Sequence, residues 1–508
     1  MTVDPTPATT TDESTSGPTD AAPTSSPDDA TTGDDPGSTG DASTGDPLHC
    51  PSIPDPGLDA LIRGRLEIPA GPIPRAAAEA LVELSSPGLE IPTITSLSGI
   101  ECLANLTTLW LPGGTFHDLT PLAALTALDD IKLESNPALT DLAPLAGLTR
   151  LRSLVVSYGV LTDLSPLAGM QSLEFLDFRD SPVHDLSPLA GLQSLGGLLV
   201  SGTEVDDIAV VAELPALQIL YIHQTDVSSF KPIAGHPALL TLFASDTHPV
   251  DLEGLGQAQV LSYASLGDCG ITDLSGLAGA PALRDLYLAG NAVSDLTPLA
   301  DIKTLESLSL DDNQISDITA LAGLPALAWL YLADNDISDL GPLASLPLTQ
   351  LHAAGNAITD PSPLAGQAML QSLDLGRNPV GPQISQLGEL PWLGELYLSD
   401  VGLTQVPLIN AMYMFDLDLS ANAISDLTPL TDYATLRTVD LTANAVTTLE
   451  PLLSAPWLAD DDCTQVSLEQ NPLTPDSLEQ VLPTLCSGAI DGFRWDGGDC
   501  NECELIPI

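Results

Sequence analysis

The sequence predicts an α/β solenoid, in which short repeated units stack and together build one parallel sheet. Apolar residues recur with a fixed period, as in the stretch 283–304, LRDLYLAGNAVSDLTPLADIKT, after which Leu305 begins the pattern again. Each unit contains a short alternation of apolar and polar residues, which is typical of a strand with one buried face. A single unit is too small to bury that face alone, so neighbouring units must stack.

The alternation predicts a strand near the start of each unit. Leu286 and Leu288 would point inward, while Tyr287 between them points outward. Asn291 comes next, where the chain must turn, and its buried amide could bond backbone groups that the turn leaves unpaired. The positions that recur from unit to unit are those of Leu283, Leu286, Leu288, Asn291, Val293, Leu296 and Leu299.

The second half of each unit predicts a short helical return. Asp295 and Thr297 could each accept a hydrogen bond from a free backbone amide, and Pro298 suits the start of a helix. The residues that remain are too few for a full α-helix. We therefore expect a 3-10 or single-turn return on the side opposite the sheet.

Seventeen such repeats follow one another over residues 106–475. They begin at Leu106, Leu128, Leu151, Leu173, Leu195, Leu217, Leu239, Leu261, Leu283, Leu305, Leu327, Leu348, Leu370, Leu393, Met414, Leu436 and Cys463. The spacing is 21 to 23 residues up to the last interval, which is 27 residues. We expect the extra residues, 460–462, to form a bulging loop.

The segment before the repeats divides near residue 48. Residues 1–48 contain no Lys or Arg and few apolar side chains, so they cannot bury enough apolar surface to offset the entropy of ordering. We expect a disordered, acidic tether rich in Thr, Ser, Pro and Asp, and a dispensable tail is the alternative. The first ten residues show neither the basic start nor the apolar core of a signal peptide.

Both ends of the stack need caps, because an open end exposes its apolar layer. Residues 49–105 are predicted to form the amino-terminal cap, with a short helix over Arg75–Leu84 followed by a degenerate repeat. Residues 476–508 abandon the pattern and are predicted to cap the other end.

These residues carry a family resemblance. The repeated L-x-x-L-x-L with its later Asn, and the entry run ITSLSGIECLANLTTLWL over residues 94–111, resemble the 22-residue leucine-rich repeats of internalin-type bacterial surface proteins and of phosphatase-regulating repeat proteins. The resemblance covers about residues 84–475. It implies a right-handed horseshoe with the parallel sheet on its concave face and short 3-10 or helical turns on its convex face. It implies recognition of a partner, and it specifies no chemistry.

The composition is strongly acidic. The formal net charge is −56, with 69 acidic and 13 basic residues. Such a surface repels nucleic acid and anionic membranes, so we expect neither as a partner, and it favours a basic partner. Solubility or adaptation to high salt would also explain the acidity. No run of about 18 apolar residues is present, so no transmembrane helix is expected.

Seven cysteines are distributed unevenly along the chain. Cys269 falls at the Asn291 position of its repeat, which indicates a buried structural thiol. The other six lie in or beside the caps, and their even numbers suggest a Cys50–Cys102 disulfide and two disulfides among Cys463, Cys486, Cys500 and Cys503. Disulfides would indicate an oxidising compartment. Zinc binding by the last four cysteines is the alternative, supported by the C-x-x-C at Cys500.

The sequence contains no recognisable catalytic or cofactor motif. We therefore expect no enzymatic activity, no cofactor and no metal site. Aspartates recur at one position of many repeats, which favours residues that cap each outer turn over a ridge that binds calcium. These aspartates are Asp118, Asp141, Asp163, Asp185, Asp273, Asp295, Asp317, Asp339 and Asp426.

The outward strand positions hold the candidate binding residues. They place 11 of the chain's 20 aromatic residues on one face, where core packing does not require them. Packing of Tyr and Trp against each other along the sheet is the alternative explanation. The ligand-binding candidates are Trp110, Phe175, Tyr221, Phe243, Tyr263, Tyr287, Trp329, Tyr331, Tyr397, Asp285, Asp311, Asp334 and Glu395. Tyr158 and Phe415 lie at adjacent outward positions, and the stretch from Tyr221 to Tyr397 is densest in aromatic residues.

These observations predict a non-catalytic, monomeric protein that recognises a partner. We expect a secreted or cell-surface protein that binds a protein or peptide on the concave sheet, and a glycan is a second possible ligand. The chain shows no cell-wall sorting motif and no immunoglobulin-like segment after the repeats, so a role in host adhesion is not carried over from the internalin resemblance. The alternative is a cytoplasmic scaffold that regulates an enzyme such as a phosphatase.

Overall fold

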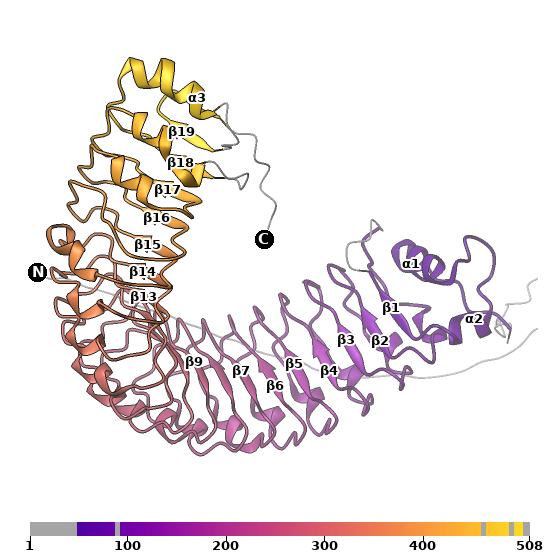
Figure 1. Ribbon diagram of the computed structural model, residues 1–508. Coiled ribbons are helices and arrows are strands. Elements are labelled where there is room, and N and C mark those ends of the chain that lie inside the picture. Colours follow the sequence, from indigo (N-terminus) through magenta and orange to yellow (C-terminus); the bar gives the residue numbers. More distant parts are fainter. Residues whose placement is uncertain (1–47, 87–91, 459–463, 487–491, 501–508) are drawn as a thin grey trace, which may run out of the picture. The chain divides into compact units, whose positions relative to one another are not determined.

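The fold was analysed in a computed structural model, which describes residues 48–86, 92–458, 464–486 and 492–500 (Figure 1). Residues 46–508 form one compact unit, and the predicted tether lies almost entirely outside the described residues. Three α-helices occur in the described part, all of them in the caps: α1 (Pro56–Leu66), α2 (Arg75–Glu79) and α3 (Leu482–Cys486).

The described residues contain one sheet of 20 short strands. The strands are β1 (Glu83–Ser85), β2 (Thr108–Trp110), β3 (Asp130–Lys132), β4 (Ser153–Val155), β5 (Phe175–Asp177), β6 (Gly197–Leu199), β7 (Ile219–Tyr221), β8 (Thr241–Phe243), β9 (Tyr263–Ser265), β10 (Asp285–Tyr287), β11 (Ser307–Ser309), β12 (Trp329–Tyr331), β13 (Gln350–His352), β14 (Ser372–Asp374), β15 (Glu395–Tyr397), β16 (Asp416–Asp418), β17 (Thr438–Asp440), β18 (Gln465–Ser467), β19 (Phe493–Trp495) and β20 (Gly498–Cys500). Each of β2 to β18 begins two residues after the first residue of a predicted repeat, except that the start of the last repeat, Cys463, lies outside the described residues.

Strands β1 to β19 pair in parallel with their sequence neighbours, and the sheet does not close on itself. The central residue of each repeat strand points into the core, as Leu286 does beside Leu308 and Ala264 of the adjacent strands. Figure 1 shows the strands on one side of each coil and the short turns on the other. The predicted solenoid is confirmed.

A 3-10 turn returns the chain after every strand from β1 to β17 except β15. The 3-10 segments are Ile100–Cys102, Thr120–Leu122, Ala143–Leu145, Ser165–Leu167, Ser187–Leu189, Ala209–Glu213, Lys231–Ile233, Leu255–Gln257, Ser275–Leu277, Thr297–Leu299, Thr319–Gly323, Gly341–Leu343, Ser362–Leu364, Gly381–Leu387, Thr428–Asp432, Glu450–Ser454 and Pro456–Leu458. A π-helical turn at Ser477–Val481 leads into α3. The short returns match the expectation drawn from repeat length.

The recurring aspartates begin these turns. Each of the nine accepts a hydrogen bond from the backbone amide two residues later, at 2.7 to 2.9 Å. Asp207, Asp251 and Asp360 do the same, although the sequence analysis did not include them. The capping interpretation is therefore confirmed for this column.

The recurring asparagines hold the turn that follows each strand. The Asn291 side chain donates to the carbonyls of Leu266 and Leu288, both at 2.9 Å, and accepts from the amides of Cys269 and Ile271. One side chain thus joins its own repeat to the preceding one. Some repeats replace Asn with Thr, which keeps a single donated bond, as Thr247 does to the Ala244 carbonyl at 2.6 Å.

The amino-terminal cap differs from the prediction in its helices. The helix predicted over Arg75–Leu84 ends at Glu79, because Leu84 is needed in the core and lies in β1, which pairs with β2. Helix α1 was not predicted. The carboxylate of Asp55 begins this helix by accepting from the Leu58 amide at 2.9 Å.

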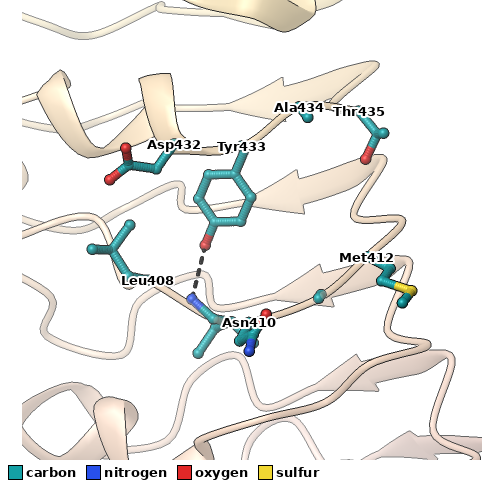
Figure 2. A pocket seen from close by; sticks show the side chains of 9 residues that line it. Leu408, Asn410, Met412, Asp432, Tyr433, Ala434 and Thr435 are labelled. Atoms are coloured by element: carbon teal, nitrogen blue, oxygen red, sulfur yellow. Dashed lines mark hydrogen bonds between the residues drawn. The ribbon is translucent and has the colours of Figure 1, made fainter.

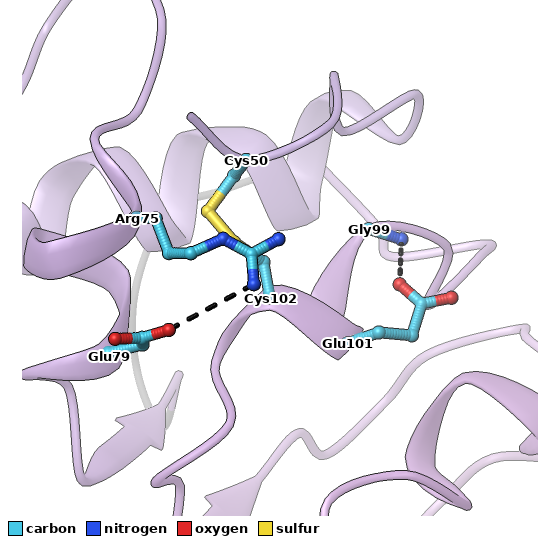
Figure 3. Close-up of a disulfide and its surroundings, with 6 residues drawn as sticks. All are labelled: Cys50, Arg75, Glu79, Gly99, Glu101 and Cys102. Atoms are coloured by element: carbon cyan, nitrogen blue, oxygen red, sulfur yellow. Dashed lines mark hydrogen bonds and ion pairs between the residues drawn. A yellow bond between two sulfur atoms is a disulfide. The ribbon is translucent and has the colours of Figure 1, made fainter. Parts of the chain in front are cut away.

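A disulfide joins Cys50 to Cys102 in the amino-terminal cap, and their Cα atoms are 5.7 Å apart (Figure 3). A second joins Cys486 to Cys500 at the other end. Cys463 and Cys503 lie outside the described residues, as does the predicted loop at 460–462. Cys269 is buried without a disulfide, as expected for a structural thiol.

The carboxy-terminal cap extends the sheet, although its sequence abandons the repeat pattern. Strand β19 adds to β18 in parallel, and β20 then reverses to pair with β19 in the antiparallel sense. The fully buried Phe493 supplies the apolar contact that a repeat leucine makes elsewhere. The sheet is therefore parallel through the repeats, and the single antiparallel strand among the described residues, β20, lies in the predicted cap.

Candidate functional site

The sheet presents two columns of side chains to solvent. In each repeat strand the first and third residues point away from the core, and parallel pairing aligns them with the same positions of the neighbouring strands. We call the surface made by the first and third residues of β2 to β18 the sheet face. All nine predicted aromatic ligand-binding residues lie on it.

Four aromatic rings form a continuous stack over β7 to β10. The ring centroids of Tyr221 and Phe243 are 4.1 Å apart, those of Phe243 and Tyr263 are 4.8 Å apart, and those of Tyr263 and Tyr287 are 5.3 Å apart. We call these four residues the aromatic ladder. Its members are partly exposed, so the ladder packs internally and still offers ring surface to solvent.

The ladder crosses between the two columns at β9. Phe243 and Tyr287 occupy the third position of their strands, where β9 has the small Ser265. Tyr263 occupies the first position of β9, and its ring lies within stacking distance of both neighbours. The small serine thus leaves the space that the Tyr263 ring needs to keep the ladder continuous.

The ladder ends at β11, whose outward residues are Ser307 and Ser309. Beyond that strand, Tyr331 packs against His352 with centroids 5.1 Å apart and donates a hydrogen bond from its hydroxyl to Gln350 at 2.9 Å. Further along, the Tyr397 hydroxyl donates to the Asp416 carboxylate at 3.0 Å. The structure therefore brings four of the predicted aromatic residues together and places the others in separate groups.

The aromatic residues near the amino-terminal end make different contacts. The ammonium group of Lys132 lies 5.8 Å from the centre of the Trp110 ring, which is a cation–π geometry. Phe175 packs over Gly197, where an added Cβ would lie 2.7 Å from the ring. Tyr158 lies after β4, and Phe415 lies before β16, so both border the sheet face.

Two of the four predicted acidic residues, Asp311 and Asp334, already have a hydrogen-bond or ion-pair partner within the chain. Asp311 accepts from the Ala333 amide and the Ser309 hydroxyl, both at 2.9 Å. Asp334 pairs with Arg377 at 2.8 Å. Asp285 lies at the first position of β10, directly beside Tyr263 of the ladder in the strand register. Glu395 occupies the same position of β15.

Burial changes the protonation behaviour of several groups on the sheet face and of the buried Cys269. It raises the pKa of Tyr263 and Tyr331, so these hydroxyls stay protonated and can donate hydrogen bonds. Burial and the nearby Glu306 raise the pKa of Asp285. Burial also raises the pKa of the Cys269 thiol, which makes it a poor nucleophile. The chemistry available here is therefore hydrogen bonding and ring contact.

The described residues contain no group of three or more His, Cys, Asp or Glu side chains arranged to hold a metal ion. Over the same ranges, no helix is long and apolar enough to span a membrane.

Sequence reasoning missed an exposed apolar surface beside the strands. Two of its aromatic members, Trp392 and Tyr413, each come immediately before the first residue of a repeat, and the third, Phe415, is one of the outward aromatic residues already predicted. Most other repeats have a small or polar residue at this position, such as Ala282, Thr304 or Ala326. Bulky apolar residues at an otherwise small position were therefore a signal that could have revealed this surface.

Comparisons with known proteins agree with this fold. The leucine-rich repeat family model matches residues 281–337. The structure is similar to that of a leucine-rich repeat protein from Leptospira interrogans, at 21% identity and a TM-score of 0.56, over 82% of this chain and 97% of that one. An internalin from Listeria monocytogenes is similar at 23% identity and a TM-score of 0.49, over 82% and 95% of the two chains.

A third similar structure is the leucine-rich repeat ectodomain of the Arabidopsis thaliana receptor kinase GASSHO1/SCHENGEN3, in complex with CASPARIAN STRIP INTEGRITY FACTOR 2. Its identity is 18% and its TM-score is 0.51, over 78% of this chain and 56% of that one. Comparison with curated protein sequences gives no significant match. The comparisons thus agree with a leucine-rich repeat fold for this chain.

Proposed function

We propose that this chain is a non-catalytic recognition protein that binds a protein or peptide on its sheet face, with the aromatic ladder as the centre of the contact. The observation that carries the proposal is the continuous stack of Tyr221, Phe243, Tyr263 and Tyr287. Core packing does not need these rings, because the central residues of the same strands already fill the core. Large aromatic side chains held on a surface are what binding hot spots use.

The mutual packing of the rings supports affinity as well as contact area. A ring held by its neighbours loses little conformational freedom when a partner binds, so less of the interaction energy is spent on ordering. The hydroxyls of Tyr221, Tyr263 and Tyr287 add polar groups that can fix the orientation of a bound backbone. A rigid, partly exposed ladder is therefore better suited to recognition than isolated aromatic residues.

Charge supports a basic partner. Asp285 borders the ladder, and the whole chain has a net charge of −56. Such a field attracts cationic ligands and speeds their association at low salt. Ring faces also bind Lys and Arg side chains by cation–π contact. We therefore propose a partner segment that presents Lys or Arg beside apolar residues.

The binding test is a selection from a displayed library of random peptides on the full-length chain. The selected peptides are then measured by calorimetry against the wild type and against Tyr221→Ser/Phe243→Ser. Loss of two hot-spot rings is expected to weaken binding at least about tenfold. A matched control, Val160→Ser/Val250→Ser, also removes two exposed apolar side chains but lies off the sheet face. Peptides that bind all three proteins equally, or a sheet face that selects only glycans in a parallel glycan array, would contradict the proposal.

We further propose that the protein works outside the reducing cytosol, at a cell surface or in secreted form. The Cys50–Cys102 and Cys486–Cys500 disulfides support this location. The test is the intact mass of protein from its native source, measured after thiol alkylation with and without reduction. Six protected cysteines and one alkylatable thiol are expected. Seven free thiols would instead favour a cytoplasmic scaffold that regulates an enzyme.

A further inference from the structure

A second apolar surface lies beside the sheet face, on the side of the repeats from which the chain enters the strands. Six large apolar side chains are exposed there: Met369 (56%), Trp392 (54%), Leu408 (59%), Met412 (62%), Tyr413 (53%) and Phe415 (41%). We call these six residues the flank patch. They come from four successive repeats and include more exposed large apolar side chains than any other stretch of this length in the described chain.

The repeat register explains why the patch is continuous. Met369, Trp392 and Tyr413 each precede the first residue of their repeat, so parallel pairing of β14, β15 and β16 brings these positions together. The rings of Trp392 and Tyr413 stack with centroids 5.8 Å apart and an angle of 23° between their planes. The patch therefore has a preformed aromatic centre.

A cavity of about 330 Å³ opens beside the patch, between residues 408–412 and 432–435 (Figure 2). Its origin is a change of side-chain size at one repeat position. The residue three before the repeat start is the fully buried Leu390 in one repeat and the small Ala411 in the next. The same segment follows β15, which among β1 to β17 is the strand with no 3-10 turn after it.

The cavity has a firm wall. The buried Tyr433 donates a hydrogen bond from its hydroxyl to the Pro407 carbonyl at 2.6 Å and accepts one from the Ile409 amide at 3.3 Å. Figure 2 shows its ring reaching from the following repeat toward the segment that carries Leu408, Asn410 and Met412. These two hydrogen bonds hold the segment around Pro407 and Ile409 in place beside the cavity, so the cavity is part of the folded structure.

The stretch of sequence that carries most of the patch is acidic. Between Arg377 and Arg437 the sequence contains no Lys, Arg or His. The same stretch contains seven carboxylates: Glu389, Glu395, Asp400, Asp416, Asp418, Asp426 and Asp432. Asp432 lines the cavity itself, and Glu389 accepts from Asn410 at 3.3 Å. The flank patch is thus an apolar surface with two carboxylates on its cavity side, and with the backbone of Arg437 paired to Phe415 at another edge.

We propose that the flank patch docks a cationic amphipathic helix of a partner protein, independently of ligand binding on the sheet face. The apolar side of the helix would lie on Trp392 and Tyr413, with one apolar side chain entering the cavity beside Met412. Lys and Arg on the rim of the helix would face the carboxylates. Methionine side chains adapt to different apolar partners, which suits such a groove. A second copy of this chain fits less well, because two chains that each carry a net charge of −56 would be placed with Asp432 and Glu389 of both copies close together.

The test uses the full-length chain and two synthetic helical peptides of 18 residues. One contains Leu at helical spacing with Lys elsewhere, and the other has Glu in place of Lys. The chain has five methionines, so labelled methionine methyl groups report the site directly by NMR. The Lys peptide is expected to shift the signals of Met369 and Met412 and to leave that of the buried Met170 unchanged.

Affinity measurements complete the test. Trp392→Ala/Tyr413→Ala removes two exposed rings, so the chain is expected to fold normally and to bind the Lys peptide at least about tenfold more weakly. The control Val160→Ser/Val250→Ser is expected to bind within about twofold of the wild type.

Several results would overturn the proposal. They are equal binding of the Glu peptide, methyl shifts that spread to Met170 or spare Met412, and unchanged affinity in Trp392→Ala/Tyr413→Ala. Sedimentation that shows a dimer lost in the same variant would also overturn it, because the occupant would then be a second copy. Variants of the aromatic ladder do not enter these measurements, so failure here leaves the sheet-face proposal intact.

Discussion

At the scale of single residues, the side chains that recur once per repeat act as connectors between coils. The amide of Asn335 shows the principle, because it donates to the Leu310 carbonyl of the preceding repeat at 2.9 Å and to the Leu332 and Ala333 carbonyls of its own. Its side-chain oxygen accepts from the Ile315 amide at 2.9 Å. The residue is buried, so water cannot replace these bonds.

Replacing this connector is expected to be costly in proportion to the bonds lost. Asn335→Ala leaves several buried backbone groups without a partner, and we expect a loss of about 3 kcal/mol in the free energy of unfolding. Asn335→Thr keeps one donated bond, as Thr203 and Thr225 do in their own repeats, and is expected to cost less. Urea denaturation followed by circular dichroism measures both. Equal losses in the two variants would show that side-chain volume, rather than hydrogen bonding, governs this position.

At the scale of elements, the amino-terminal cap depends on one carboxylate. Asp55 accepts from Leu58 at the start of α1 and also from the amides of Thr95 and Ser96, at 2.7 and 3.1 Å. The same side chain therefore begins the helix and holds it against the first coil. Burial acts to raise the pKa of Asp55, but these hydrogen bonds together lower it, so the residue carries its charge in the folded cap.

Asp55→Ala is expected to destabilise the cap by about 3 kcal/mol, because it removes a helix cap together with buried hydrogen bonds. Repeats contact only their neighbours, so the damage should remain local. Hydrogen exchange measured by mass spectrometry should show faster exchange in α1 and β1 and unchanged exchange in β10 to β12. Asp59→Ala is the matched control, since it removes a partly exposed ion pair with Arg63 that contributes little. Faster exchange throughout the repeats would contradict the local effect.

The repeats could be predicted from the sequence better than the helices of the amino-terminal cap. The period of Leu286, Leu288 and Asn291 predicts strand, turn and core in every repeat, because each coil uses the same local contacts. Helix α1 was missed because it occurs once, and its signals, Asp55 followed by Pro56, have no second copy to support them. The end of α2 depends on where Leu84 joins the sheet, which is a tertiary constraint that helix propensity does not contain.

The candidate site, like the fold, could be predicted only in part from the sequence. Alternation along a strand correctly placed the aromatic residues on one face. It could not show that Tyr263 joins the third-position rings across Ser265, because that contact depends on the space left by a small neighbour. Likewise, the cavity beside Ala411 arises from a size difference between adjacent repeats, which a pattern of apolar residues does not record.

At the scale of the whole molecule, the capping aspartates link stability to pH. Hydrogen bonds from the residue two positions later lower the pKa of Asp118, Asp185, Asp295, Asp317, Asp360 and Asp426 below the ordinary 3.8. A carboxylate whose folded pKa is depressed stabilises the protein above its unfolded pKa. That contribution is lost as the pH falls through the lower, folded value. The small losses of stability at the six aspartates are therefore expected to add up as the pH falls.

Exchanging these six aspartates for asparagine keeps an acceptor oxygen at each turn and removes the titrating group. The melting temperature of the variant is expected to fall less than that of the wild type between about pH 4 and pH 2.5. Differential scanning calorimetry across this range makes the comparison. Six exposed aspartates outside the column, also changed to asparagine, provide the control for lost charge. If both variants flatten the curve equally, general charge repulsion rather than turn hydrogen bonding sets the acid response.

The in-register parallel pairing of β1 to β19 has a mechanical consequence. Each short strand is bonded only to the strands before and after it, and the strands lie across the direction in which the repeats stack. A pulling force applied to the two ends of the chain would therefore break the hydrogen bonds of one strand at a time. Every 22-residue repeat released in this way adds about 75 Å of slack. Under load the molecule would lengthen in equal steps while the remaining repeats keep their structure.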